Sequence, residues 1–326
     1  MVHAKGKNIG NHNLTLLDLF KNMGKKGSKE MNLNLTRDDR YKFKKILGIG
    51  ATGLVYKAWD RRLKRYVAAK VSKKRTNNFV PETRLMGRLE HNNIAAIYDA
   101  NSGLDISYII MEYIQGTTLS AFCNKDNLLP LQRVSEIIIE VCKGLHYAHS
   151  NGVIHRDIKP SNIILNKQGI PKIMDFGISQ MVGKTQPMGL CGTPSYMSPE
   201  QLKGEIATNI SDIFSLGCVL YELLEGQKAF GGENPYTIIY KVINHDPAPL
   251  SMPQPQFKPI FEKIIRKALA KKPEDRYKSC HDLAYDLNRT LVYLNSQKQA
   301  KKSTTLPSVI NRIKEGLKIS NPPGVQ

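Results

Sequence analysis

The residue pattern of the central part of the chain changes near Gln115-Gly116, and this change constrains the fold more than any other feature. Before it, short runs rich in β-branched and aromatic residues alternate with turn residues, a pattern typical of strands. After it, apolar residues recur at helical spacing over longer runs. With 326 residues, 41% of them hydrophobic, the chain suits one large or two modest globular units. We therefore predict an α+β fold, with a small sheet-rich unit followed by a larger, mainly helical one.

The sheet-rich part is predicted to hold five strands and one helix. The helix is expected over Pro81–Leu89, where Leu85 and Leu89 lie four residues apart. The strands are expected at Tyr41–Leu47, Leu54–Trp59, Arg65–Val71, Ile94–Asp99 and Ser107–Tyr113.

The helical part carries four long segments of apolar periodicity. They cover Leu131–Ser150, Asp212–Leu224, Ile260–Leu269 and Cys280–Leu294. Asn151-Gly152 after the first segment and Gly226 after the second are typical of helix ends, where a left-handed residue closes the last turn.

The formal net charge is +20, a balance that favours polyanions such as nucleic acid, anionic lipid, nucleotide or acidic protein surfaces. Solubility combined with basic tails explains the same balance equally well. Residues 1–40 carry +4 (8 − 4) and residues 296–326 carry +5 (6 − 1), which leaves +11 between them. Because the charge is not confined to the ends, it does not by itself predict a nucleic-acid-binding tail.

The five cysteines are scattered and form no CxxC pair, which argues against a disulfide framework or a zinc site and for a reducing compartment. No apolar stretch approaches the ~18 residues that a membrane span needs. The basic N-terminus holds only a short apolar piece, Leu14–Phe20, without a small-residue cleavage site. We therefore expect a cytoplasmic protein without a transmembrane segment.

Two features of the sheet-rich part point to phosphate chemistry. The segment Gly48-Ile-Gly50-Ala-Thr-Gly53-Leu-Val55 lies between two expected strands, and its glycines allow backbone N–H groups to approach phosphate oxygens. A tight hairpin alone would also explain it, whereas a dinucleotide-binding turn would precede a helix. Lys70 lies among apolar neighbours on the next strand, where it is read either as a clamp on the α- and β-phosphates or as a surface lysine at a strand end.

The octapeptide His155-Arg-Asp-Ile-Lys-Pro-Ser-Asn162 follows the long helix and its glycine end, so it is expected on a loop. Asp157 is suited to orient a hydroxyl group or accept its proton, and Lys159 to neutralise a transferring phosphoryl group. Asn162 offers a hard oxygen ligand for magnesium, as does Asp175 of the Asp-Phe-Gly tripeptide that follows. His155 is expected to be a packed, hydrogen-bonded loop residue rather than an acid or base.

These motifs, in this order, resemble the eukaryotic-like serine/threonine protein kinase family over about residues 41–290, and bacterial members of it in particular. The resemblance implies a bilobal fold, with an N-lobe at 41–113 and a C-lobe at 114–294. A basic, flexible extension would precede the lobes at 1–40, and a basic tail would follow at 295–326. The resemblance also implies ATP and Mg2+ as cofactors, and transfer of the γ-phosphoryl group to Ser/Thr hydroxyls of proteins, autophosphorylation included.

The resemblance assigns further roles to single residues. Glu82 would pair with Lys70, and Met111 would be the gatekeeper of an adenine pocket to which Met174 also contributes. The implied nucleotide-binding set is Leu47, Gly48, Gly50, Gly53, Val55, Ala68, Lys70, Met111, Glu112, Ile114 and Ile164. Plain core packing would also explain the apolar members of this set.

Three structural roles are implied in the helical part. Gly192–Glu200 resembles the end of the activation segment, where Thr193 would touch Asp157 and Lys159. Glu200 would pair with Arg276, and Asp212 would brace the catalytic loop.

The activation segment, Asp175–Glu200, offers few residues that can be phosphorylated. Met188–Cys191 occupies the usual primary site, and only Thr185 and Ser179 lie upstream of it. We expect either control by a phosphate at Thr185 acting through Arg156, or activity that is constitutive or depends on a partner. Ser161 and Thr118 replace acids found in basic-directed relatives, so no strong preference for basic targets is expected.

Four hypotheses stay open. An active kinase is favoured because every polar residue that the reaction needs is present, namely Lys70, Glu82, Asp157, Asn162 and Asp175. A non-catalytic scaffold that recruits an activator or partner through its basic ends would commonly lack one of them. A nucleic-acid binder would need a recognition motif that we do not find, so nucleic acid is not expected as the primary partner. A small-molecule kinase would not need Gly192–Glu200.

Overall fold

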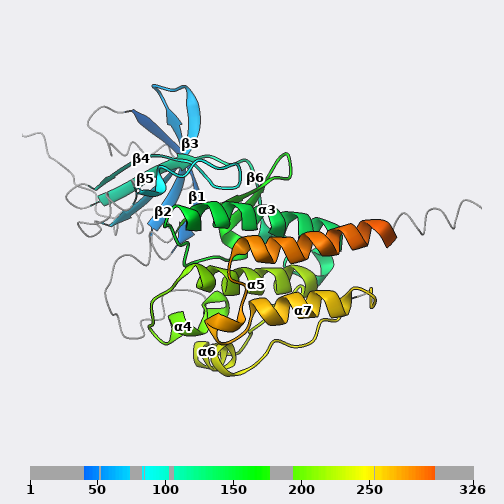
Figure 1. Cartoon of the computed structure of the whole chain (residues 1–326). Coiled ribbons are helices and arrows are strands. Elements are labelled where there is room, and N and C mark those ends of the chain that lie inside the picture. The colour runs from blue at the N-terminus through cyan, green and yellow to red at the C-terminus, as the bar shows by residue number, and fades with distance from the viewer. Residues whose placement is uncertain are drawn as a thin grey trace, which may run out of the picture. The chain divides into compact units, whose positions relative to one another are not determined.

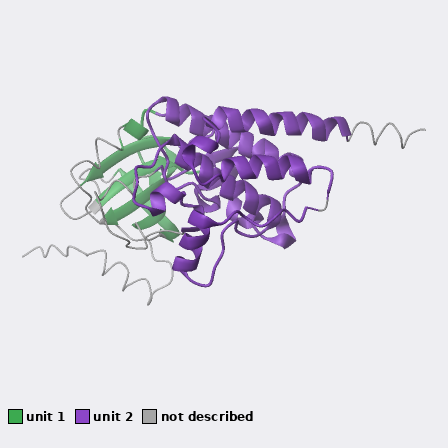
Figure 2. Cartoon of the chain, turned by 60° about the horizontal axis from the view of Figure 1, so that its bottom comes forward, with its two compact units in different colours: residues 1–88, 96–114 green, residues 89–95, 115–326 purple. Residues whose placement is uncertain are grey.

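The computed structural model describes residues 40–50, 53–73, 83, 85–102, 106–176, 194–252 and 254–297. They belong to two compact units (Figure 2). The first unit comprises the described residues up to 88 together with 96–114, and the second comprises 89–95 and the described residues from 115 onward. The chain thus enters the second unit briefly between the third and fourth strands of the first.

The first unit is a five-stranded antiparallel sheet with the strand order β1-β2-β3-β5-β4 (Figure 1). Its strands are β1 Tyr41–Gly50, β2 Gly53–Asp60, β3 Arg65–Lys73, β4 Ile97–Ser102 and β5 Ile106–Glu112. The five predicted strands are confirmed, except that β4 begins later than expected. Ile94 instead forms a parallel bridge with Ile173 in the second unit, which explains why the predicted strand 94–99 starts too early.

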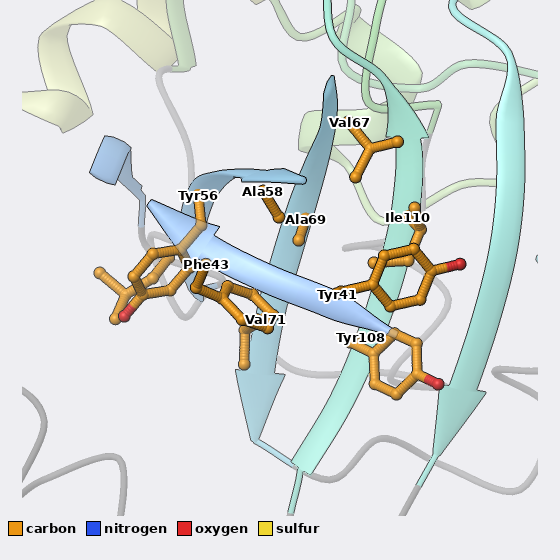
Figure 3. Packing of buried hydrophobic residues seen from close by; sticks show 10 residues of the cluster. Tyr41, Phe43, Tyr56, Ala58, Val67, Ala69, Val71, Tyr108 and Ile110 are labelled. Atoms are coloured by element: carbon orange, nitrogen blue, oxygen red, sulfur yellow. The ribbon is translucent and has the colours of Figure 1, made fainter. Parts of the chain in front are cut away.

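One face of this sheet carries the core of the first unit. Buried and half-buried residues alternate along β2, because successive side chains of a strand point to opposite faces. The buried face combines aromatic and aliphatic side chains (Figure 3), and the rings of Phe43 and Tyr56 meet edge to face with centroids 5.4 Å apart. Its members are Tyr41, Phe43, Leu54, Tyr56, Ala58, Val67, Ala69, Val71, Tyr108 and Ile110.

The second unit is mainly helical, so the predicted α+β class is confirmed. Its helices are α3 Leu131–Ser150, α4 Pro199–Leu202, α5 Asn209–Glu225, α6 Pro235–Asn244, α7 Lys258–Ala268 and a last helix over 280–297. Single 3-10 turns lie at Leu119–Phe122, Lys125–Asn127, Pro160–Asn162, Pro194–Tyr196 and Pro273–Asp275. Helix α5 is buried on all sides from residue 211 to 225 and contacts both α3 and α7 (Figure 1), so it forms the centre of this unit.

The four predicted helices are confirmed, but the sequence missed smaller elements of the second unit. A three-stranded antiparallel sheet pairs β6 Gly116–Thr118, β7 Ile163–Asn166 and β8 Pro171–Ile173. Strands this short do not show a period of two, and they gain their partners from distant parts of the chain. Helix α6 was also missed, although its start has a recognisable signal in the capping residue Asn234 followed by Pro235.

The predicted helix ends are confirmed by backbone geometry. Gly152 follows α3 with φ of +73°, and Gly226 ends α5 with φ of +68°. Of the predicted helix over Pro81–Leu89, residues 83, 85 and 86 are described and helical. No helix in the described ranges combines the length and the apolar character that crossing a membrane requires.

We expect Gly226→Ala to destabilise the protein more than Gly204→Ala. Both glycines have a left-handed backbone, which costs an alanine about 1–2 kcal/mol. An added Cβ at Gly226 would also lie 2.6 Å from the backbone nitrogen of Lys125, whereas at Gly204 it would meet nothing within 4 Å. Urea denaturation should therefore show an additional loss of about 1–3 kcal/mol for Gly226→Ala. Equal losses for the two variants would contradict the close approach of α5 to residues 124–125.

Candidate active site

In the first unit, the sheet face opposite the core gathers four of the predicted nucleotide-binding side chains. Val55 lies opposite Lys70, and Ala68 lies opposite Met111, so these four side chains share one face. Ala68, Lys70 and Met111 are buried, and Val55 is half-buried. The face therefore presents small and aliphatic groups around the buried ammonium group of Lys70, and Lys57, opposite Ala68, lies on the same face.

The glycine turn lies at one end of the same sheet. Gly50 and Gly53 pair where β1 gives way to β2, and Gly48 lies opposite Val55. A Cβ at Gly53 would come 2.1 Å from the carbonyl oxygen of Val71, so only glycine fits there. A Cβ at Gly48 would meet nothing within 4 Å, and its neighbour Leu47 is 41% exposed.

The end of β5 contributes backbone groups. The N–H of Glu112 donates to the carbonyl oxygen of Ala96 at 2.8 Å, and a carboxylate oxygen of Glu112 accepts from the N–H of Ala96 at 3.3 Å. This double contact fixes the point at which the chain leaves the sheet toward Ile114. Ile164, the remaining member of the predicted set, lies on β7 in the second unit, opposite Thr118 and Lys172.

In the second unit, the 155–162 loop brings together three of the predicted polar residues. Oδ2 of Asp157 accepts from Nζ of Lys159 at 2.7 Å and from Nδ2 of Asn162 at 3.1 Å. Nδ2 of Asn162 also donates to the backbone oxygen of Asp157 at 2.8 Å. Both amide hydrogens of Asn162 thus serve Asp157, and this turns the amide oxygen of Asn162 away from Asp157.

The segment with Asp175 is joined to this loop by its backbone. The N–H of Met174 donates to the carbonyl oxygen of Asn162 at 2.8 Å. Asp175 itself has φ of +57° and Arg156 has φ of +66°. Such values are uncommon outside glycine, and they persist where the surroundings hold the backbone firmly.

His155 is the packed loop residue that the sequence predicted. It is fully buried, its Nδ1 accepts from the N–H of Asp157 at 3.2 Å, and its Nε2 lies 2.8 Å from the carbonyl oxygen of Met174. Burial lowers the pKa of His155, so the ring is neutral and carries its proton on Nε2, donated to Met174. The buried ring of Phe176 packs against it at 4.6 Å between centroids.

Asp212 braces the loop, as the resemblance implied. This fully buried carboxylate accepts from the N–H of His155 at 2.8 Å and from the N–H of Arg156 at 2.7 Å. The two bonds use different carboxylate oxygens, so the backbone just before Asp157 is held at two points.

Comparison with known proteins gives this geometry its context. A family model described as the protein kinase domain matches residues 41–286. The chain belongs to the protein kinase family. Serine/threonine-protein kinase PknB of Mycobacterium leprae (strain TN) is 38% identical over 266 residues, which are 77% of this chain and 43% of that protein. The probable serine/threonine-protein kinase SCO3848 of Streptomyces coelicolor is 36% identical over 268 residues, 77% of this chain and 40% of that protein.

These findings confirm the family predicted from the motifs, and both relatives are bacterial. The chain spans less than half the length of these curated relatives. Several predicted features lie outside the described residues. They are Glu82, Gly177, Ser179, Thr185, Met188–Cys191, Thr193, the extension up to residue 39 and the tail from residue 298.

A buried ion pair supports the segment that carries Glu200. The guanidinium of Arg276 donates to both carboxylate oxygens of Glu200 at 2.8 Å, and the hydroxyl of Ser211 donates to one of them at 2.6 Å. Burial opposes the negative charge, but these bonds outweigh it and lower the pKa of Glu200 to about 2. The predicted Glu200–Arg276 pair is therefore present.

The sequence reading missed a second partner of Asp212. Nε2 of His149, near the end of α3, lies 2.8 Å from Oδ2 of Asp212, and Nδ1 lies 3.9 Å from the sulfur of Cys280. Burial opposes a charge on His149, but the bonds to Asp212 and Cys280 outweigh it and raise its pKa to about 9. Position alone could not reveal this pair, because 63 residues separate the two partners along the chain.

Contacts that hold the 194–202 segment were missed as well. Nε2 of Gln201 donates to the carbonyl oxygen of Arg156 at 3.0 Å, which ties this segment to the 155–162 loop. The hydroxyl of Tyr196 donates to Glu222 at 2.6 Å, and the hydroxyl of Ser215 donates to the carbonyl oxygen of Tyr196 at 2.7 Å. Polar residues on a buried helix such as α5 are the signal that could have found them.

We expect Arg276→Met to cost about 3–5 kcal/mol of folding free energy, because it leaves the buried carboxylate of Glu200 without its charge partner. The double variant Arg276→Met/Glu200→Gln should recover part of this loss in urea denaturation. A double variant no more stable than the single one would contradict the role of the unpaired charge.

The charge on His149 predicts that stability depends on pH. Its pKa is raised from 6.5 to about 9 on folding, so the contribution is fully present below pH 6.5 and is lost as the pH rises through about 9. Between these limits the free energy of unfolding should fall by on the order of 1–3 kcal/mol more in the natural protein than in His149→Gln. Parallel urea-denaturation profiles of the two proteins across this range would rule the contribution out.

Proposed function

We propose that this chain is an active serine/threonine protein kinase that uses ATP and Mg2+ to phosphorylate Ser/Thr hydroxyls of proteins, itself included. The observation that carries the proposal is the arrangement of Asp157, Lys159 and Asn162 on a loop whose backbone is bound twice by Asp212. Phosphoryl transfer depends mainly on positioning and on neutralising charge, and a loop held in this way supplies both.

In this proposal Asp157 receives the substrate hydroxyl. Lys159 and Asn162 both bind Oδ2 of Asp157, while no described side chain binds Oδ1. Oδ1 then accepts the hydroxyl hydrogen as the substrate oxygen bonds to the γ-phosphorus, the bond to the β-phosphate oxygen breaks, and ADP leaves. The ammonium of Lys159 lies next to the carboxylate and neutralises charge that develops on the transferred group.

Asn162 and Asp175 would hold Mg2+. The fit rests on the donor set, because an amide oxygen and a carboxylate are hard ligands that magnesium prefers. The amide oxygen of Asn162 is turned away from Asp157 by the two bonds of its Nδ2. Magnesium, when bound, neutralises the charge of the phosphate groups.

The first unit would bind the nucleotide. Lys70 would contact the α- and β-phosphates and pair with Glu82, and the glycine turn would cover the phosphates. Val55, Ala68 and Met111 share the face of the sheet with Lys70, which favours an apolar site for adenine. Leu47 would extend this adenine site, and the backbone of Glu112 and Ile114 would bond to the ring. The role of Ile164 in the second unit stays a prediction.

The acceptor and the setting are proposed from the motifs and the relatives. Lys159 and the Thr-Pro-Ser-Tyr stretch ending at Tyr196 resemble serine/threonine kinases, and the relatives carry that designation in their names. The cytoplasmic location, control at Thr185 and recruitment of an activator or scaffold partner by the basic ends stay predictions.

The test measures phosphate transfer from labelled ATP with Mg2+, to the protein itself and to a generic basic protein. Asp157→Asn should lower the rate by roughly 10²–10⁴-fold, since a positioned proton acceptor contributes about that much. ATP affinity should stay close to that of the natural protein, because Asp157 is not assigned to the nucleotide. The exposed Asp126, replaced by Asn, is the matched control and should keep full activity.

Undiminished incorporation in Asp157→Asn would remove Asp157 from the reaction. Bound ATP without any transfer by the natural protein would instead favour the scaffold hypothesis.

A further inference from the structure

The positive charge of the described residues gathers in the first unit. This unit holds twelve Lys/Arg and three Asp/Glu among its described residues, a net charge of +9 (12 − 3). The described residues of the second unit hold nineteen and eighteen, a net charge of +1 (19 − 18). An even distribution for solubility would not produce this contrast, so the first unit is the part of the fold suited to an anionic partner.

The charge is densest at the turn between β2 and β3, residues 61–64, which we call the cationic turn. Arg61, Arg62 and Lys64 occupy three of its four positions, and all three are exposed. Asp60, the carboxylate that precedes them in the sequence, is buried and bound to the guanidinium of Arg40 at 2.8 Å. Asp60 also accepts from the backbone N–H groups of Arg62 and Leu63 in the turn, and these bonds hold its carboxylate in place.

An exposed apolar side chain lies within the same turn. Leu63, between Arg62 and Lys64, is 56% exposed, and Tyr66 at the start of β3 is 43% exposed. An apolar side chain flanked by cations is the combination that binds the boundary between lipid headgroups and acyl chains. A partner that offered only phosphates would give Leu63 nothing to bury against.

The aromatic residues near the turn distinguish a membrane from a single-stranded nucleic acid. Nζ of Lys57 lies 3.8 Å from the ring centroid of Tyr66 and 4.6 Å from that of Tyr113. The guanidinium of Arg65 lies 3.5 Å from the ring centroid of Tyr98. Bases bind by stacking on open ring faces, and a cation already occupies one face of each of these rings, which leaves less ring surface for stacking.

The cationic turn lies at the opposite end of β2 from the glycine turn. The eight residues of β2 lie between it and the glycine turn, which places the two roughly 25 Å apart. A partner at the cationic turn would therefore leave the glycine turn uncovered.

We propose that the cationic turn binds the anionic surface of a phospholipid membrane, with Leu63 entering the headgroup region. The binding is electrostatic over Arg61, Arg62 and Lys64 and apolar at Leu63. It goes beyond phosphate transfer and does not depend on it.

The first experiment measures co-sedimentation of the full chain with vesicles of phosphatidylglycerol and phosphatidylcholine, and with vesicles of phosphatidylcholine alone. Arg61→Glu/Arg62→Glu/Lys64→Glu should weaken binding to the anionic vesicles on the order of 100-fold, and added salt should weaken binding of the natural protein. The control Lys263→Glu/Arg266→Glu/Lys272→Glu makes the same change of charge at exposed positions of the second unit and should weaken it far less. Equal losses in the two triple variants would overturn the proposal.

The second experiment tests the apolar contact. Leu63→Ser should weaken binding to the anionic vesicles several-fold, whereas Ile206→Ser, at an 86% exposed position of the second unit, should not. Neither variant should change phosphate transfer to a soluble protein or the thermal unfolding midpoint. Unchanged vesicle binding by Leu63→Ser, or tighter binding of the natural protein to duplex DNA than to anionic vesicles at the same salt, would overturn the proposal.

Discussion

The carboxylate of Asp212 is fully buried, and a charge in that position persists only where donors surround it. Three donors do so: the backbone N–H groups of His155 and Arg156, and the imidazole of His149. The need to satisfy this carboxylate therefore determines the path of the loop that carries Asp157. His155, held by Asp212, in turn contacts the carbonyl oxygen of Met174 and so positions the segment with Asp175. One buried charge therefore organises most of the proposed chemistry of the second unit.

Helix α5 holds several separate segments with its first two turns. Ser211 binds Glu200, Asp212 binds the catalytic loop, and Ser215 binds the carbonyl oxygen of Tyr196. Since α5 is buried on all sides, these polar side chains lie in an environment where an unmet hydrogen bond is costly. Substitutions on this helix should for that reason affect folding and phosphate transfer together, whereas changes to the cationic turn should affect neither.

The two units differ in the net charge of their described residues, and the proposals assign them different partners. In the second unit the charged groups that hold the 155–162 loop and the segment with Glu200 are buried or paired. The net charge of the described residues of this unit is +1. In the first unit one buried ammonium, Lys70, faces the proposed nucleotide site, while the cationic turn lies at the end of β2 that is far from the glycine turn. A phosphate site needs few, well-placed donors, whereas a membrane surface attracts many exposed ones.

The order of the motifs in the sequence determined the family and the identity of the polar residues. The five strands of the first unit were predicted from the sequence as well, because strand periods are local properties of the chain. The partners of those residues were decided by the tertiary structure. Only the folded chain joins His149 to Asp212 and brings Cys280 beside them. These bonds keep His149 charged although burial opposes its charge, whereas burial lowers the pKa of His155 and leaves it neutral. The short strands β6, β7 and β8 follow the same rule, since each is too short to show its own period and forms through pairing with distant segments.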